Sequence, residues 1–175
     1  MTFFNLRKAR VAELPVIIAI DDAASQLYAD AGLAIELKSQ HPFIVAESTR
    51  WANAISHGLA YVATNELDQA IGFITLGFID TEHYLDQIAV LPEHMQQGIG
   101  TKLLELAIAW SHDKPLWLTT YSHIPWNKPY YEKQGFKQMT EDACGPQLCQ
   151  ILHAQRLALP APEQRIAMVR LANTA

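Results

Sequence analysis

Two glycines placed just before an amphipathic stretch are the residues of this chain whose type and spacing most clearly indicate chemistry. They lie in Met95-Gln96-Gln97-Gly98-Ile99-Gly100, between a strand-like segment and a helical pattern. Glycine has no side chain, so backbone N–H groups can approach a ligand there, and amides at the start of a helix favour an anion. The segment therefore predicts a binding site for a phosphate-bearing cofactor.

The neighbouring elements must hold this loop in place. Tyr84–Val90 is rich in β-branched and aromatic residues and predicts a strand. Pro92 stops that strand because proline supplies no backbone N–H. Apolar residues recur at helical spacing after the loop, so we expect a helix over Thr101–Ser111.

Two common phosphate-binding loops have a different spacing. A P-loop requires G-x-x-x-x-G-K-[ST], whereas Gly100-Thr101-Lys102 has its residues in another order. A dinucleotide-binding loop requires a third glycine or alanine, and Leu103 occupies that position. The sequence thus excludes both loops.

Three motifs together resemble the GNAT family of N-acetyltransferases. The glycine loop is similar to the family's Q/R-x-x-G-x-G/A, although Met95 replaces the first residue, so that contact is missing or moves to Gln96 or Gln97. Val90-Leu91-Pro92-Glu93 is similar to the family's V-x-P strand exit, and Tyr131–Phe136 to its Y-E-x-x-G-F signature. The resemblance implies an acyltransferase that uses acetyl-CoA as co-substrate and needs no metal.

The resemblance also implies which residues form the site. The backbone of Ile88, Ala89 and Val90 would pair with the pantetheine arm of the cofactor, and Asn127 would add a contact. Tyr131 would be the general acid that protonates the sulfur of CoA, with its neighbour Tyr130 as the alternative. The pyrophosphate would be bound by the loop residues Gln96, Gln97, Gly98, Ile99, Gly100 and Thr101.

Acetyl transfer to an amine also requires a proton acceptor, since alkyl ammonium groups have a pKa of about 10. A carboxylate, or water ordered by one, can remove that proton. Asp86 interrupts an apolar strand, so we predict that it is the proton acceptor or the water organiser. It is equally open whether Asp86 instead pairs with a nearby Arg or Lys or simply faces solvent. Glu82 and His83, nearer the start of the strand, are weaker alternatives for the role.

The whole chain predicts one N-acetyltransferase domain over residues 1–175. We expect an α/β (α+β) fold of the GNAT-like acyl-CoA N-acyltransferase type, with a mixed, mostly antiparallel central sheet and helices on both faces. Further strands are expected at Phe3–Arg10, Leu59–Thr64, Ala70–Ile79, Leu116–Tyr121, Phe136–Met139 and Arg165–Leu171. Further helices are expected from Glu13 to Tyr28, at Glu47–Ser56, after Pro129 and at Gln147–Leu157, with Ala31–Phe43 irregular or briefly helical.

Composition limits the class of protein. Half of the 175 residues are apolar and the net charge is −5, with no basic cluster, which argues against nucleic-acid binding. No run of about 18 apolar residues predicts a membrane span, and the first residues do not resemble a signal peptide. We therefore expect a cytoplasmic protein in which Cys144 and Cys149 are reduced, and we leave a homodimer open.

We predict that the protein moves an acetyl group from acetyl-CoA to a primary amine of a small molecule or peptide, by direct attack in a ternary complex. Transfer of another acyl group is one alternative. A CoA-binding sensor or interaction module without catalysis is another. Residues that would select the acceptor lie in Ser25–Phe43 and after Ser122, where the sequence carries no motif.

Overall fold

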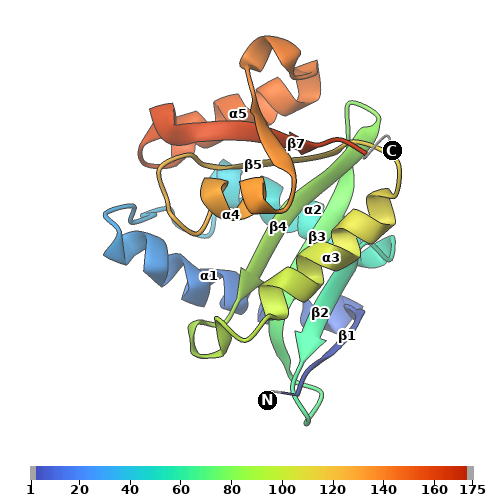
Figure 1. Cartoon of the computed structure of the whole chain (residues 1–175). Helices are drawn as coiled ribbons and strands as arrows, with labels where there is room; N and C mark the ends of the chain where they lie inside the picture. Colours follow the sequence, from blue (N-terminus) through green and yellow to red (C-terminus); the bar gives the residue numbers. More distant parts are fainter. Residues whose placement is uncertain (1–2, 173–175) are drawn as a thin grey trace. The chain divides into compact units, whose positions relative to one another are not determined.

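The computed structural model describes residues 3–172, in which strands and helices follow the order expected from the sequence (Figure 1). The elements are β1 (Asn5–Lys8), α1 (Leu14–Asp30), α2 (Pro42–Ser56), β2 (Ala60–Thr64), β3 (Ala70–Ile79), β4 (Glu82–Val90), α3 (Ile99–Ser111), β5 (Leu116–Tyr121), α4 (Lys128–Lys133), β6 (Phe136–Met139), α5 (Pro146–Ala158) and β7 (Arg165–Arg170).

The strands form one sheet in the order β1-β2-β3-β4-β5-β7-β6. Antiparallel pairing joins β1 to β2, β2 to β3, β5 to β7 and β6 to β7, whereas β4 and β5 are parallel. The parallel register pairs His83 with Leu116 and Tyr84 with Trp117. The mixed, mostly antiparallel sheet predicted from the sequence is thus confirmed.

The chain divides into two compact units. One contains the residues up to Leu76 together with Asp86–Ala107, and the other contains Gly77–Leu85 together with the residues from Ile108 onward. The elements β3, β4 and α3 each contribute residues to both units. A single domain over the whole chain stays a prediction.

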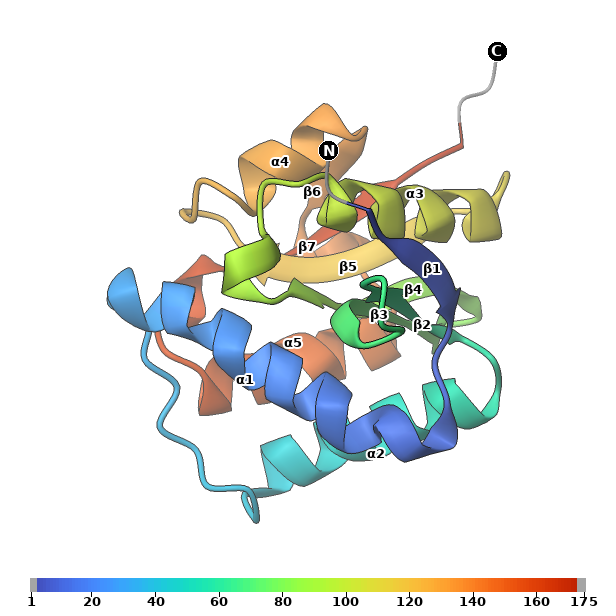
Figure 2. The same cartoon turned by 90° about the horizontal axis from the view of Figure 1, so that it is seen from below.

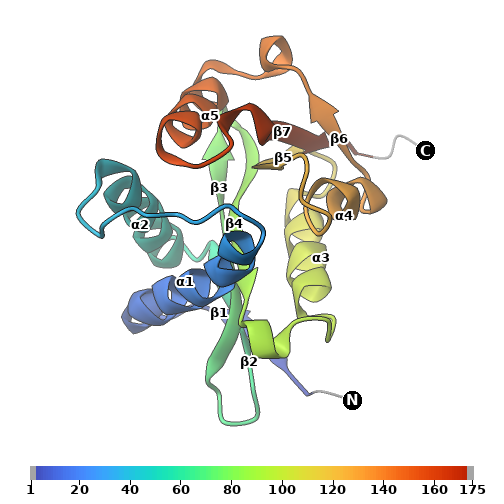
Figure 3. The same ribbon diagram turned by 90° about the vertical axis from the view of Figure 1, so that its left-hand side faces the viewer.

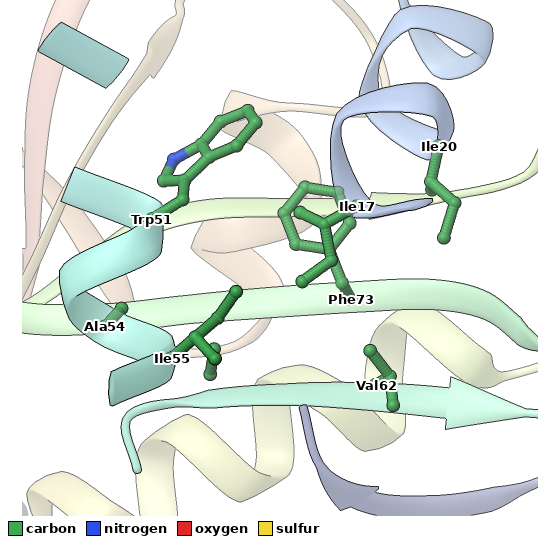
Figure 4. Close-up of a cluster of buried hydrophobic side chains, with 8 residues drawn as sticks. Ile17, Ile20, Trp51, Ala54, Ile55, Val62 and Phe73 are labelled. Carbon is green, nitrogen blue, oxygen red and sulfur yellow. The ribbon is translucent and has the colours of Figure 1, made fainter. Parts of the chain in front are cut away.

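In the first unit, α1 and α2 cover one face of the strands and α3 covers the other (Figures 2 and 3). Helix α1 buries Ile17, Ile20 and Ala24, which share one helical face. The buried cluster on this face joins side chains of α1, α2, β2 and β3, and Trp51 and Phe73 lie with ring centroids 5.5 Å apart. Figure 4 shows its members Ile17, Ile20, Trp51, Ala54, Ile55, Val62 and Phe73.

Helix α2 begins earlier than the sequence predicted. The expected start was Glu47, with Ala31–Phe43 irregular or briefly helical, but the helix starts at Pro42. His41 caps it, because its ring Nδ1 accepts a hydrogen bond from the backbone N–H of Phe43 at 3.1 Å. Proline is favoured in a first helical turn, so Pro42 starts this helix and does not interrupt it.

In the second unit, α4 and α5 lie on opposite sides of β5 and β7 (Figure 3). A two-residue turn, Asp80-Thr81, joins β3 to β4, with φ values of 50° and 65°. Positive φ at both positions is the geometry of the type I′ hairpin turn. The Asp80 carboxylate accepts the backbone N–H groups of Gln147 and Leu148 at 2.8 and 3.0 Å, so the same turn caps the start of α5.

Candidate functional site

The glycine loop follows β4 and turns sharply into α3. Met95 is extended, whereas Gln96 and Gly98 have positive φ values of 61° and 84°. Ile99 begins the helix, and its side chain is buried. Glycine adopts the left-handed conformation of position 98 without steric cost, which is why the sequence has a glycine there.

The loop leaves open space for a ligand. Among residues 3–172, a side-chain carbon built on Gly98 would meet no heavy atom within 4 Å outside its chain neighbours, and one on Gly100 would meet only Val90 Cγ2 at 3.9 Å. The N–H of Lys102 makes the first bond of the helix, to the oxygen of Gly98 at 3.0 Å. The amides of Ile99 and Gly100 lie ahead of it, where helix N–H groups have no acceptor within the helix. The loop therefore fits a phosphate or pyrophosphate group.

A close approach between elements fixes the loop to the sheet. Gly72 on β3 lies so near its neighbours that a Cβ there would come within 3.2 Å of the Ala89 oxygen and of Ile99 Cγ2. A larger residue would push α3 away from the strands. Gly72 thus lets Ile99 anchor the first turn of α3 directly beside β4.

Strand β4 departs from regular alternation at Asp86 and Gln87. Val90 faces α3, as its contact with Gly72 shows, whereas Ala89 packs on the opposite face against the α1 and α2 cluster. Alternation would place Gln87 with Ala89 and Asp86 with Val90. Instead, Gln87 contacts α1 and Asp86 contacts α2, so both polar side chains reach the same face of the sheet.

The structure pairs Asp86 with an arginine. Arg50 Nε lies 2.8 Å from Asp86 Oδ2, and Arg50 Nη2 lies 3.2 Å from Oδ1. The Asp86 side chain is 11% exposed. Arg50 therefore binds both carboxylate oxygens, so the pairing with a basic residue that the sequence left open for Asp86 is the one observed.

Asp21 is a second carboxyl group at this position, and the sequence motifs did not reveal it. Gln87 Nε2 donates a hydrogen bond to Asp21 Oδ1 at 2.7 Å. Burial raises the pKa of Asp21 to about 7, the hydrogen bond from Gln87 opposes the shift, and the charges of Asp22 and Asp86 add to it. One signal was present in the sequence, since Asp21 lies four residues after the buried Ile17 and so on the apolar face of α1.

The predicted residues Asn127 and Tyr131 lie together at α4 in the second unit. The backbone N–H of Tyr131 donates to the Asn127 oxygen at 3.0 Å, and both side chains are buried. The Tyr131 ring lies 5.6 Å from the ring of Phe136 and 5.4 Å from that of Tyr130. Of the two tyrosines, Tyr130 is the more exposed.

Glu82 and His83, which the sequence also offered as proton acceptors, have structural contacts in the second unit. A Glu82 oxygen accepts a hydrogen bond from Trp117 Nε1. The His83 ring packs against Phe78 and Trp110 at centroid distances of 5.0 and 4.3 Å. Burial, together with the charge of Lys114, lowers the pKa of His83.

Residues 3–172 hold neither a metal-binding cluster nor a membrane-spanning helix. No three His, Cys, Asp or Glu side chains in that range are grouped so as to hold a metal ion. No helix in the same range is both long enough and apolar enough to cross a bilayer.

Comparison with known proteins identifies the family. Residues 56–138, which include the glycine loop and Tyr131, match the model of the acetyltransferase (GNAT) domain. The chain is also 28% identical over 95 residues to the uncharacterised N-acetyltransferase YafP of Escherichia coli (strain K12). Residues 56–138 thus carry a GNAT acetyltransferase domain, the domain of a family of acyltransferases. The YafP match covers 54% of this GNAT protein and 57% of YafP, a little over half of each.

Solved structures share the fold of this GNAT protein. The PaiA N-acetyltransferase of Thermoplasma acidophilum, in complex with coenzyme A, aligns over 97% of this chain and 99% of its own, with 20% identity and a TM-score of 0.67. The N-acetylglutamate synthase of Neisseria gonorrhoeae, complexed with coenzyme A and N-acetyl-glutamate, has a TM-score of 0.69 at 15% identity. That alignment covers 97% of this chain and 35% of the synthase chain. The predicted GNAT-like α/β fold is thus confirmed.

Proposed function

We propose that this GNAT protein transfers an acetyl group from acetyl-CoA to a primary amine of a small molecule or peptide, by direct attack in a ternary complex. The observation that carries the proposal is the open glycine loop at the start of α3, where Gly98 leaves room for an anion. The family match and the coenzyme A bound to structural neighbours support this cofactor.

Backbone groups of the first unit would hold the cofactor. Amides of the loop residues, Gln96, Gln97, Gly98, Ile99, Gly100 and Thr101, would bind the pyrophosphate, and Ile88, Ala89 and Val90 would pair with the pantetheine arm. The ammonium group of Lys102 is instead engaged by Glu105, at 2.8 Å. Acetyl-CoA supplies the activated thioester. Asn127, buried at the start of α4, would add a cofactor contact.

Tyr131 would donate a proton to the leaving sulfur. The amine lone pair forms the new C–N bond, the C–S bond breaks with its electron pair on sulfur, and the thiolate takes the hydroxyl proton of Tyr131, which solvent replaces. A tyrosine hydroxyl suits this step because it can donate a hydrogen bond while remaining neutral near pH 7. The buried position of Tyr131 beside Phe136 supports the assignment.

Asp86 would order water, or accept a proton, on the amine side of the reaction. Its bidentate pairing with Arg50 favours the first of these roles, because both oxygens are already bound and held in one orientation. We also propose a cytoplasmic location, supported by the free thiols of Cys144 and Cys149, with a homodimer as the alternative to a monomer.

The test is a screen of amines with acetyl-CoA that measures release of free thiol. The panel contains amino acids, polyamines and peptides, each with a control that lacks the amine. We expect release that depends on one class of amine, with the acetylated product seen by mass spectrometry. Coenzyme A binding without turnover of any amine would indicate a sensor, and turnover only with longer acyl-CoA donors would indicate another acyl group.

A further inference from the structure

We infer that the carboxylate of Asp21, on α1, accepts the proton of the acceptor amine, and that Asp86 acts only through the water and the charge around it. This inference rests on the proposed N-acetyltransferase activity. It concerns four residues of the first unit, Asp21, Arg50, Asp86 and Gln87.

The position of Asp21 follows from its contact with β4. Gln87 holds Asp21 Oδ1 at 2.7 Å, and Gln87 directly precedes Ile88, Ala89 and Val90. Those three residues are the ones proposed to hold the arm that carries the acetyl group. A carboxylate fixed to Gln87 therefore lies beside the strand segment along which the thioester would be held.

The two carboxylates of this face differ in what binds them. Both oxygens of Asp86 contact Arg50, whereas Asp21 has a hydrogen bond at Oδ1 only, and Oδ2 has no hydrogen-bond partner among residues 3–172. No cation within that range forms an ion pair with Asp21. Oδ2 of Asp21 is thus the oxygen available to take a proton.

The charges around Asp21 suit a cationic substrate. Asp22 on the same helix and Asp86 on β4 are the negative charges that act on Asp21, and Arg50 on α2 pairs with Asp86. One cation among three carboxyl groups leaves an excess of negative charge, which attracts an ammonium group. Burial and the charges of Asp22 and Asp86 keep the pKa of Asp21 near 7, a value suited to a base that works at neutral pH.

The proton balance of the step is complete. One N–H proton of the ammonium group passes to Asp21 Oδ2, and the freed lone pair attacks the acetyl carbonyl. Asp21 then releases its proton to solvent, and the attacking nitrogen loses a second proton to solvent as the amide forms. The sulfur takes a proton from Tyr131, which solvent replaces. The net products are the N-acetylated amine, free CoA and one proton.

The main test compares Asp21→Asn with Glu66→Gln in the full chain. Asparagine keeps the size of Asp21 and an oxygen for Gln87 but cannot act as a base. We expect kcat of Asp21→Asn to fall by about 10²–10⁴-fold, with coenzyme A affinity by calorimetry unchanged. Glu66 is exposed in the loop between β2 and β3, away from Asp21, and Glu66→Gln should stay within a few-fold of the wild type.

The pH profile gives a second readout. Wild-type kcat/KM should rise with pH through about 7, as Asp21 loses its proton, and Asp21→Asn should lack this rise. Gln87→Met removes the hydrogen bond that lowers the pKa of Asp21, so it should shift the rise to higher pH. This variant decides the question if Asp21→Asn does not fold.

The raised pKa of Asp21 also determines how the stability of the protein changes with pH. Folding raises the pKa of Asp21 from 3.8 to about 7, so the folded protein keeps a proton that the unfolded chain loses in this range. The stability that Asp21 contributes is fully present below its unfolded-state pKa of 3.8 and is lost as pH rises through its folded-state pKa of about 7. The Tm of the wild type relative to that of Asp21→Asn should therefore decrease from about pH 4 to about pH 8.

Three outcomes would overturn the inference. If Asp21→Asn retains turnover and the pH rise while Asp86→Asn loses both, Asp86 is the proton acceptor. An unshifted rise in Gln87→Met would show that another group titrates there. If the wild type acetylates no amine, the proposed function fails, and the assignment of Asp21 fails with it.

Discussion

The Tyr131 hydroxyl belongs to a side chain that aromatic neighbours hold in one place. The ring is 9% exposed and packs edge-on against Phe136 and Tyr130. Packing of this kind depends on the ring and not on the hydroxyl. Replacing Tyr131 with phenylalanine therefore isolates the chemical role of its hydroxyl group.

We predict that Tyr131→Phe lowers kcat by about 10²–10⁴-fold, the usual contribution of general acid catalysis. Its affinity for acetyl-CoA should change by about 1 kcal/mol or less, because only one hydrogen bond is lost. Steady-state thiol release and calorimetry measure the two quantities. Tyr130→Phe is the control and should behave as the wild type. A loss of turnover in Tyr130→Phe alone would move the proton donor to Tyr130.

Single residues differ in how well the sequence predicted them. Tyr131 and the loop glycines lie within contiguous motifs, so their spacing carries the signal. Asp21 and Asp86 depend on tertiary contacts, because Gln87 is 66 residues from Asp21 and Arg50 is 36 residues from Asp86. The sequence could propose a partner for Asp86, but the choice of Arg50 required the packing of α2 against β4.

At the scale of elements, the hairpin turn between β3 and β4 has two tasks. Asp80 adopts a left-handed conformation, and its carboxylate also accepts two N–H groups at the start of α5. Gly145 makes this possible, because a side-chain carbon there would overlap the Asp80 carboxylate. The turn thus connects two strands and fixes a helix.

We predict that Asp80→Gly lowers the free energy of unfolding by about 0.5–2 kcal/mol, the usual cost of losing a helix cap. Asp80→Asn should lose less, since asparagine tolerates positive φ and keeps one acceptor oxygen for the two N–H groups. Urea denaturation followed by circular dichroism measures both variants. Equal midpoints for Asp80→Gly and the wild type would show that the cap contributes nothing.

Element boundaries were predicted well where local signals are strong. The bounds of β3, β5 and β6 agree with those expected from the sequence. Runs of apolar and β-branched residues mark β3 and β5. Helix α2 starts five residues before the expected position, since its start depends on the His41 cap. The irregularity of β4 at Asp86 and Gln87 has no sequence signal and emerges only when both side chains meet their helices.

At the scale of the whole chain, the segment that matches the family model and the segment before it have different proposed roles. Residues 56–138 contain the glycine loop, Gln87, Asp86 and Tyr131, whereas Asp21 and Arg50 lie before the matched segment. Family members that bind the same cofactor need the same loop, whereas each acceptor needs its own set of side chains around it. This explains why the sequence alone could predict a cofactor, whereas the proposal for the acceptor side needed the structure.

Calorimetric titration of coenzyme A into Gly98→Asp and Gly98→Asn tests the account most directly. The φ of 84° at this position strains both residues alike, and they have the same size, so they differ chiefly in charge. We predict that the wild type and Gly98→Asn bind coenzyme A, and that Gly98→Asp binds about tenfold more weakly or worse, through repulsion of the pyrophosphate. Equal affinity in a folded Gly98→Asp variant, or no binding by the wild type, would contradict the account.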